Sequence, residues 1–160
     1  AEGRGHGPAP AAPSRLAVRV FEAAPGLPPS AQIAAIHDAL RGSRGAPVSV
    51  ARIDRNRGVV TYSGLGNVAG TIVADGRSRH MVSANGTAGH YAGRIHEFTY
   101  PWSEDAVLVM HSDGLSSRWQ IERYPGLPSR HPTLVAGILY RDWCRERDDV
   151  TVVAARLRAP

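Results

Sequence analysis

Beyond Pro47 the chain alternates apolar and polar residues in short segments, and this pattern constrains the fold more than any other feature. Segments 47–54 and 58–66 flank the polar turn "RNRG", and segments 67–74 and 78–84 flank "DGR". Alternation of this kind buries one face of a strand, and such short polar turns are typical of β-hairpins. The sequence therefore predicts two successive hairpins.

Helical spacing of apolar residues precedes the hairpins. We expect a first helix over 14–24, with Ser14 as N-cap because Pro10 and Pro13 disfavour an earlier start, and a second over 30–41 capped by Ser30. The second helix should turn one apolar face to the core and end at a glycine; the residues concerned are Ile33, Ile36, Leu40 and Gly42.

The remaining chain returns to strands and adds a longer helix. We expect strands over 93–100, 105–112 and 150–158, a short helix over 117–122 and a longer one over 131–149. In the longer helix Leu134, Ile138 and Trp143 should contact the core. With no internal repeat, this order predicts a single α+β domain of packed layers over residues 1–160.

Composition narrows the functional classes. A hydrophobic share of 42% and a charged share of 21% are typical of a soluble globular protein, and no apolar run approaches the length of a membrane span. The single cysteine, Cys144, excludes an internal disulfide and agrees with a cytoplasmic location. All 19 basic residues are arginines scattered along the chain, which argues against a nucleic-acid-binding stripe but suits a phosphorylated partner.

Two acidic residues stand at the ends of predicted strands. The apolar run 107–110 leads into His111, Ser112, Asp113 and Gly114, and Asp148 precedes the last strand. If these strands are antiparallel neighbours, both carboxylates lie at one rim of the sheet, where a hard cation such as Mg²⁺ or Mn²⁺ would offset their repulsion. The alternative is structural: Asp113 and Gly114 form a plain turn after one strand, and Asp148 caps the other. Spacing alone leaves the metal site and this alternative open.

Several motifs, taken together and in order, resemble the metal-dependent protein phosphatases, the PPM or protein phosphatase 2C-like family. "HSDGL" and "RDDVTVV" are similar to its metal-binding strand ends, and "AEGRGHGPAPAA" looks like its Asp-Gly-x-Gly-His-Gly segment. "YSGLGNVAG" and "NGTAGH" resemble loops of its SpoIIE-type branch, especially the RsbX-like serine phosphatases. The resemblance implies an α/β/β/α sandwich of two antiparallel sheets flanked by helices.

The resemblance also implies a site. Asp113 and Asp148 match the family's metal-binding aspartates, Gly3 matches a glycine whose carbonyl ligates a metal, and Glu2 stands where the family has a bridging aspartate. We therefore expect Glu2, Asp113 and Asp148 to be catalytic, with Gly3 as a further ligand of two Mn²⁺ or Mg²⁺ ions. A water held by these ions would attack a phosphoserine or phosphothreonine of a regulatory protein, of the anti-sigma-factor antagonist type.

Two departures from the family pattern leave a second function open. Glu2 is one methylene longer than the aspartate it replaces, and the chain starts at a motif that follows a β-strand in the family, so we expect the domain to be N-terminally incomplete. The chain is then either an active phosphatase or a phosphatase-fold module that has weakened or lost catalysis and acts by binding. Its oligomeric state is not set by these motifs.

Other polar residues have two interpretations. Arg4 either contacts the phosphate or is a solvated side chain, and His6 and His90 either contact the phosphate or a water or shape loops. Asn85 and Gly86 are expected in a turn near the rim. His111 alternates away from the expected site. Cys144, in the predicted long helix, is expected to pack rather than to act as a nucleophile.

Overall fold

The computed structural model describes residues 11–145 and 149–157. Its helices are α1 (Ala11–Ala23), α2 (Pro29–Ala39) and α3 (Pro132–Trp143), with 3₁₀ turns η1 (Ile121–Arg123) and η2 (Leu127–Ser129). Its strands are β1 (Val48–Asp54), β2 (Val59–Leu65), β3 (Val68–Ala74), β4 (Arg77–Met81), β5 (Gly86–Thr87), β6 (Tyr91–Ala92), β7 (Phe98–Pro101), β8 (Val107–Ser112) and β9 (Val152–Ala155). No helix within these residues is both long and apolar enough to cross a bilayer.

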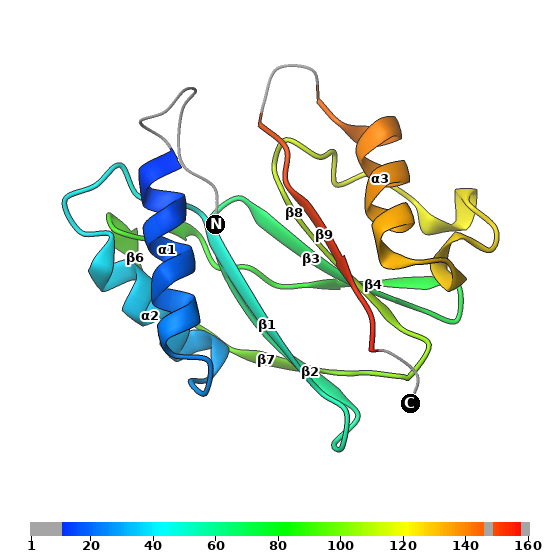
Figure 1. The fold of residues 1–160 in the computed structure, drawn as a ribbon, viewed down its shortest axis with the longest axis horizontal. Helices are drawn as coiled ribbons and strands as arrows, with labels where there is room; N and C mark the ends of the chain where they lie inside the picture. Colours follow the sequence, from blue (N-terminus) through cyan, green and yellow to red (C-terminus); the bar gives the residue numbers. More distant parts are fainter. Residues whose placement is uncertain (1–10, 146–148, 158–160) are drawn as a thin grey trace.

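The strands form two main antiparallel sheets, in the orders β1-β2-β7 and β4-β3-β8-β9, and β5 pairs with β6. Figure 1 shows α1 and α2 side by side on one flank and α3 on the opposite flank, with the sheets between them. The arrangement is the expected α/β/β/α sandwich. Both predicted hairpins are present, as β1–β2 and β3–β4.

Three buried clusters correspond to the three interfaces between the four layers. The first joins α1 and α2 to the first sheet and includes Ala17, Ile33, Ile36, Leu40, Val48, Val50 and Leu65. The second lies between the sheets and includes Val60, Tyr62, Ile72, Met81 and Leu108. The third joins α3 to the second sheet and includes Val73, Val107, Val109, Val135 and Leu139.

The uninterrupted apolar run of β8 follows from this layering. Successive side chains of a strand point to opposite faces, so Val107 and Val109 pack toward α3 while Leu108 packs into the interface between the sheets. A strand buried on both faces cannot alternate with polar residues. This strand therefore passes through the centre of the domain and reaches its rim at Asp113.

Both predicted N-caps are wrong. α1 begins at Ala11, and Pro13 lies in its first turn, where a missing N–H removes no helical hydrogen bond. α2 begins at Pro29, so Ser30 is inside the helix. Its backbone N–H and its hydroxyl donate to Oε2 of Glu97, at 3.0 and 3.1 Å, so a carboxylate 67 residues away caps the helix.

The predicted long helix is too long and its core face is shifted. α3 ends at Trp143, six residues before the predicted end at residue 149, because the chain then pairs with residues after β8. Leu134 is 48% exposed, whereas Val135 and Leu139 are buried; Ile138 and Trp143 pack partly against the core as expected.

Other boundaries also differ from the predictions. The segment 93–100 contributes only β7, which starts at Phe98; the residue before it, Glu97, caps α2 with its side chain. The helix predicted over 117–122 is the 3₁₀ turn η1, and β4 ends at Met81 rather than at residue 84. Gly86 lies in the short strand β5 instead of a turn, and its neighbour Asn85 is an exposed bend.

Candidate functional site

Asp113 lies directly after β8, beside the start of the last strand. β8 and β9 pair antiparallel, with His111 opposite Val152, so the C-terminal end of one meets the N-terminal end of the other. The condition on which the shared rim depended, that these two strands are antiparallel neighbours, is therefore met. The Asp113 side chain is half-buried, so it lies at the rim rather than inside the core.

Ser112 fastens the chain before β9 to the end of β8. Its N–H donates to the carbonyl of Thr151 at 3.1 Å, and its hydroxyl accepts from the N–H of Thr151 at 3.0 Å. The same hydroxyl donates to the carbonyl of Asp149 at 3.4 Å. Because Ser112 is only 4% exposed, these bonds are shielded from water and hold the Asp149–Thr151 segment beside Asp113.

Gly114 makes that approach possible. A Cβ at this position would overlap the carbonyl oxygen of Asp149 and would lie 2.8 Å from Cγ2 of Val150. The glycine is therefore required by close approach of a second backbone rather than by an unusual φ. Asp-Gly after a buried strand is the sequence signature of this junction.

Asn67 is a site residue that the sequence analysis did not single out. The pairing of β3 with β8 sets Val68 opposite Ser112, so Asn67 is next to Asp113 across the sheet. Its Nδ2 donates to Oδ2 of Asp113 at 3.2 Å. Within residues 11–145 and 149–157, the Asp113 carboxylate accepts no other hydrogen bond. A polar residue just before a strand that pairs with β8 was the available signal, but it could be used only once the pairing was known.

His111 belongs to the support of the site. Its ring is buried, Nε2 accepts from the indole N–H of Trp119 at 3.3 Å, and Nδ1–H donates to the carbonyl of Ser112 at 2.8 Å. A proton on Nε2 would face another donor. Burial lowers the pKa of His111 below its ordinary value, so the neutral ring is favoured.

The predicted ligand set is only partly within the described residues. Glu2, Gly3 and Asp148 lie outside them, as do Arg4 and His6. Asp113 is described, and Asp149, which follows Asp148 in the chain, reaches the Gly114 turn with its carbonyl. Over residues 11–145 and 149–157, no three His, Cys, Asp or Glu side chains are grouped closely enough to hold a metal.

The donors at the junction nevertheless suit a hard divalent cation. Asp113 offers a carboxylate, the nearby backbone offers carbonyl oxygens, and the imidazole of His111 is occupied by bonds from both nitrogens. Oxygen donors of this kind favour Mg²⁺ or Mn²⁺ over softer metals.

His90 and Cys144 have structural contacts. Nε2 of His90 lies 2.8 Å from the carbonyl of Ser43, and His37 accepts from the N–H of Gly89 at 3.1 Å, so both rings hold the loop against the end of α2. Cys144 follows α3 and pairs with Leu115 in an isolated bridge. For these two residues the structural interpretation is the one that the contacts support.

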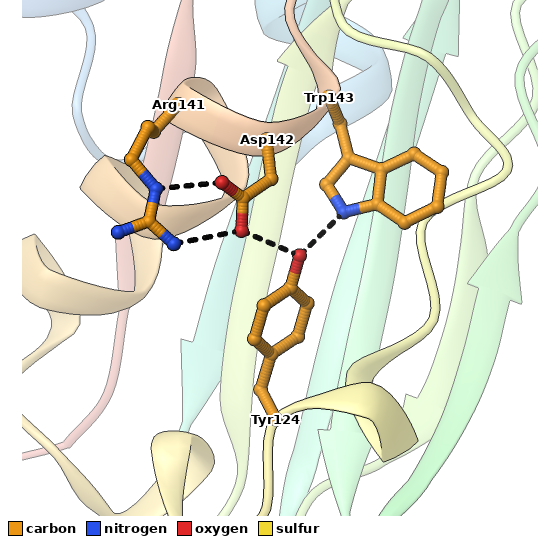
Figure 2. Close-up of polar contacts among 4 residues, drawn as sticks. All are labelled: Tyr124, Arg141, Asp142 and Trp143. Carbon is orange, nitrogen blue, oxygen red and sulfur yellow. Dashed lines mark hydrogen bonds and ion pairs between the residues drawn. The ribbon is translucent and has the colours of Figure 1, made fainter.

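A polar cluster holds the end of α3 beside the site. Figure 2 shows the hydroxyl of Tyr124 donating to Oδ2 of Asp142 at 2.8 Å while it accepts from the indole N–H of Trp143 at 2.9 Å. Arg141 forms a bidentate pair with Asp142, at 2.6 and 2.9 Å. The hydrogen bonds from Arg141 and Tyr124 lower the pKa of Asp142 to about 2. The chain leaves the helix at this cluster and runs along residues 114–116.

The comparison with protein families identifies the chain. The model of the Stage II sporulation protein E (SpoIIE) family matches residues 1–158, which is almost the whole sequence. The chain belongs to the SpoIIE family. The predicted relationship to the SpoIIE-type branch is thus confirmed. A separate comparison with proteins of curated function found no match.

Solved structures share the fold of this SpoIIE-family domain. A chain from the bacterial stressosome, a modular system adapted to control secondary messenger signalling, is 25% identical with a TM-score of 0.78, over 96% of this chain and 81% of that one. RsbX in complex with magnesium is 19% identical with a TM-score of 0.81, over 98% and 78%. The serine/threonine phosphatase PstP/Ppp of Mycobacterium tuberculosis is 16% identical with a TM-score of 0.71, over 99% and 86%.

Proposed function

We propose that this domain is a metal-dependent protein serine/threonine phosphatase that removes the phosphate from a phosphorylated regulatory protein. The observation that carries the proposal is the position of Asp113 where β8 and β9 meet, held there by Asn67, in a chain that belongs to the SpoIIE family. A carboxylate at this junction is suited to bind a cation, because half-burial shields its charge and one oxygen is oriented by a hydrogen bond.

Each residue has a distinct part in the proposed site. Asp113 would be a ligand through Oδ1, which accepts no hydrogen bond from the described residues, while Asn67 occupies Oδ2. Glu2, the carbonyl of Gly3 and Asp148 are the further ligands that the family pattern proposes. When bound, two Mn²⁺ or Mg²⁺ ions would activate water and neutralise charge on the phosphoryl group. Ser112 and Gly114 keep the two strand ends together so that the ligands can converge.

The substrate is proposed to be a phosphoserine or phosphothreonine protein of the anti-sigma-factor antagonist type, in the cytoplasm. Similarity to a stressosome chain and to RsbX supports this kind of partner. The arginine-only basic composition and the net charge of +5 also favour a phosphorylated, negatively charged partner over a neutral one.

Replacing Asp113 by asparagine tests the function. With Mn²⁺ present, we expect the wild type to hydrolyse p-nitrophenyl phosphate and a phosphoserine peptide, and we expect EDTA to abolish both activities. Asp113→Asn should lower kcat/KM by roughly 100-fold or more, because the variant loses the charge that holds the cation. Asp75→Asn is the matched control: Asp75 is in the β3–β4 turn with φ 50°, a conformation that asparagine tolerates, so its activity should equal that of the wild type.

The same assay separates the enzyme from the binding module. Equal hydrolysis by wild type and Asp113→Asn would assign the activity to another site or a contaminant. If neither protein turns over substrate but both bind the phosphorylated regulator in calorimetry, the binding-module function replaces the enzyme. That second function is favoured by Glu2, whose extra methylene alters a position where ion geometry is strict.

A further inference from the structure

Arg145 is attached by its backbone to the residue that follows Asp113. After α3 ends, the chain runs antiparallel to residues 114–116: Ser116 N–H donates to the carbonyl of Trp143 at 2.9 Å, and Arg145 N–H donates to the carbonyl of Gly114 at 2.8 Å. The polar cluster of Figure 2 fixes the start of this run. The Cα of Arg145 is therefore held at the same rim as the Asp113 carboxylate.

The guanidinium of Arg145 is exposed and makes no hydrogen bond or ion pair within the described part of the chain. Arg141 on α3 and Arg156 after β9 differ in this respect. Arg141 is paired with Asp142, and Arg156 donates to the carbonyls of Asp105, Pro128 and Ser129.

We propose that Arg145 binds the phosphoryl oxygens of the substrate and so determines affinity for phosphorylated residues at this site. The proposal rests on the phosphatase function proposed above. A phosphoryl dianion that approaches Asp113 is repelled by that carboxylate, and a cation held beside it offsets the repulsion. The planar fork of arginine matches two phosphoryl oxygens, and a guanidinium with no partner among the described residues has its donors available.

The experiment compares Arg145→Gln and Arg145→Lys with a matched control, Arg79→Gln. Arg79 is exposed on β4, at the opposite edge of the same sheet, so this control removes the same charge away from the site. With a phosphoserine peptide and Mn²⁺, Arg145→Gln should raise both KM and the inhibition constant of inorganic phosphate roughly ten-fold, with a smaller change in kcat. Arg145→Lys should recover part of the loss, and Arg79→Gln should behave as wild type.

Two further readouts exclude a merely structural role for Arg145. The Mn²⁺ concentration that gives half-maximal activity and the thermal midpoint should be unchanged in Arg145→Gln. A shift in the Mn²⁺ requirement without a change in the phosphate inhibition constant would overturn the proposal, because Arg145 would then act on the metal ligands rather than on the phosphate.

Failure of this inference and failure of the phosphatase function give different results. An active wild type whose KM and phosphate inhibition constant are unchanged in Arg145→Gln keeps the function and overturns the role of Arg145. If the wild type shows no turnover, binding of inorganic phosphate is measured directly by calorimetry. Binding that is lost in Arg145→Gln but kept in Arg79→Gln supports the proposal, and binding that is equal in all three proteins, or absent from the wild type, overturns it.

Discussion

The β1–β2 pair and the β8–β9 pair are both antiparallel, but they are held together in different ways. β1 and β2 are joined by four residues and pair over seven positions, from Val48 opposite Leu65 to Asp54 opposite Val59. β8 and β9 pair over four positions, and η1, η2 and α3 lie between them in the chain. Only the second pair carries the candidate site. Its geometry therefore depends on contacts between distant segments, whereas the hairpin depends on its own turn.

The contacts at the two places reflect this difference. In the hairpin turn, Arg57 N–H donates to Oδ1 of Asp54 at 3.0 Å, and Gly58 adopts a left-handed φ of 60°. At the β8–β9 junction, the Ser112 side chain, the missing Cβ of Gly114 and the cluster around Tyr124 all act across the fold. A perturbation at the junction should therefore affect stability and function together, and one in the turn should affect stability alone.

Among the changes that compare the two strand pairs, the largest effect is expected from Gly114→Ala. The new Cβ would collide with the Asp149 carbonyl, which is backbone and cannot rotate away, so the strand ends must separate. We expect unfolding to become easier by about 2–3 kcal/mol and Mn²⁺-dependent phosphatase activity to fall at least ten-fold, measured by urea denaturation and peptide hydrolysis. Retained activity at full stability would show that the junction tolerates an opening of this size.

Gly58→Ala is the paired change in the hairpin. Its Cβ would meet the Trp102 carbonyl at an ordinary 3.5 Å, so the cost is the strain of a left-handed alanine, about 1 kcal/mol. Phosphatase activity should be unchanged. Loss of activity in Gly58→Ala comparable to that in Gly114→Ala would break the distinction between the two strand pairs.

An effect smaller than that of Gly114→Ala is expected from Tyr124→Phe. The change removes the hydroxyl that links Asp142 to Trp143, and loss of these hydrogen bonds should lower the free energy of unfolding by about 1 kcal/mol. Activity should fall a few-fold, since residues 143–145 lose part of their anchor beside Gly114.

The effect of Tyr124→Phe should depend on pH. The pKa of Asp142 is held at about 2, below its ordinary value of 3.8, so its contribution to stability is present above the ordinary value and is lost as pH falls through about 2. The difference between wild type and Tyr124→Phe should therefore be constant from neutral pH to about pH 4 and shrink below it. Urea denaturation across this range measures it, and a difference that grows on acidification would contradict the assignment.

The smallest effect is expected from Gly137→Ala in α3. No atom lies within 4 Å of the position of its Cβ, and its φ is not left-handed, so alanine fits without strain. Lower entropy of the unfolded chain and better helix propensity should raise stability by roughly 0.5–1 kcal/mol. Activity should stay the same. Increased activity would indicate that α3 itself, rather than the chain beyond it, limits the site.

Several features of the fold could be predicted because their causes are local in the sequence. Alternation and short polar turns predicted both hairpins, and the apolar run before Asp113 and Gly114 predicted the strand that became β8. The N-caps could not be found in this way, because the carboxylate that caps α2 comes from Glu97, far along the chain. Leu134 was misplaced because a helix of mixed composition offers several possible core faces.

The candidate site divides along the same line. Asp113 was predicted from its own strand and turn, since a carboxylate and a glycine after a buried strand are visible in adjacent letters of the sequence. Asn67 and Arg145 were identified only when β3 was paired with β8 and the end of α3 was set against Gly114. The sequence by itself determined the two hairpins and the end of β8 at Asp113. Tertiary packing alone decided which side chains lie together at the end of β8. Asn67 donates a hydrogen bond to Asp113, 46 positions along the chain, because the register of the paired strands brings the two residues together, and spacing along the chain does not reveal that register.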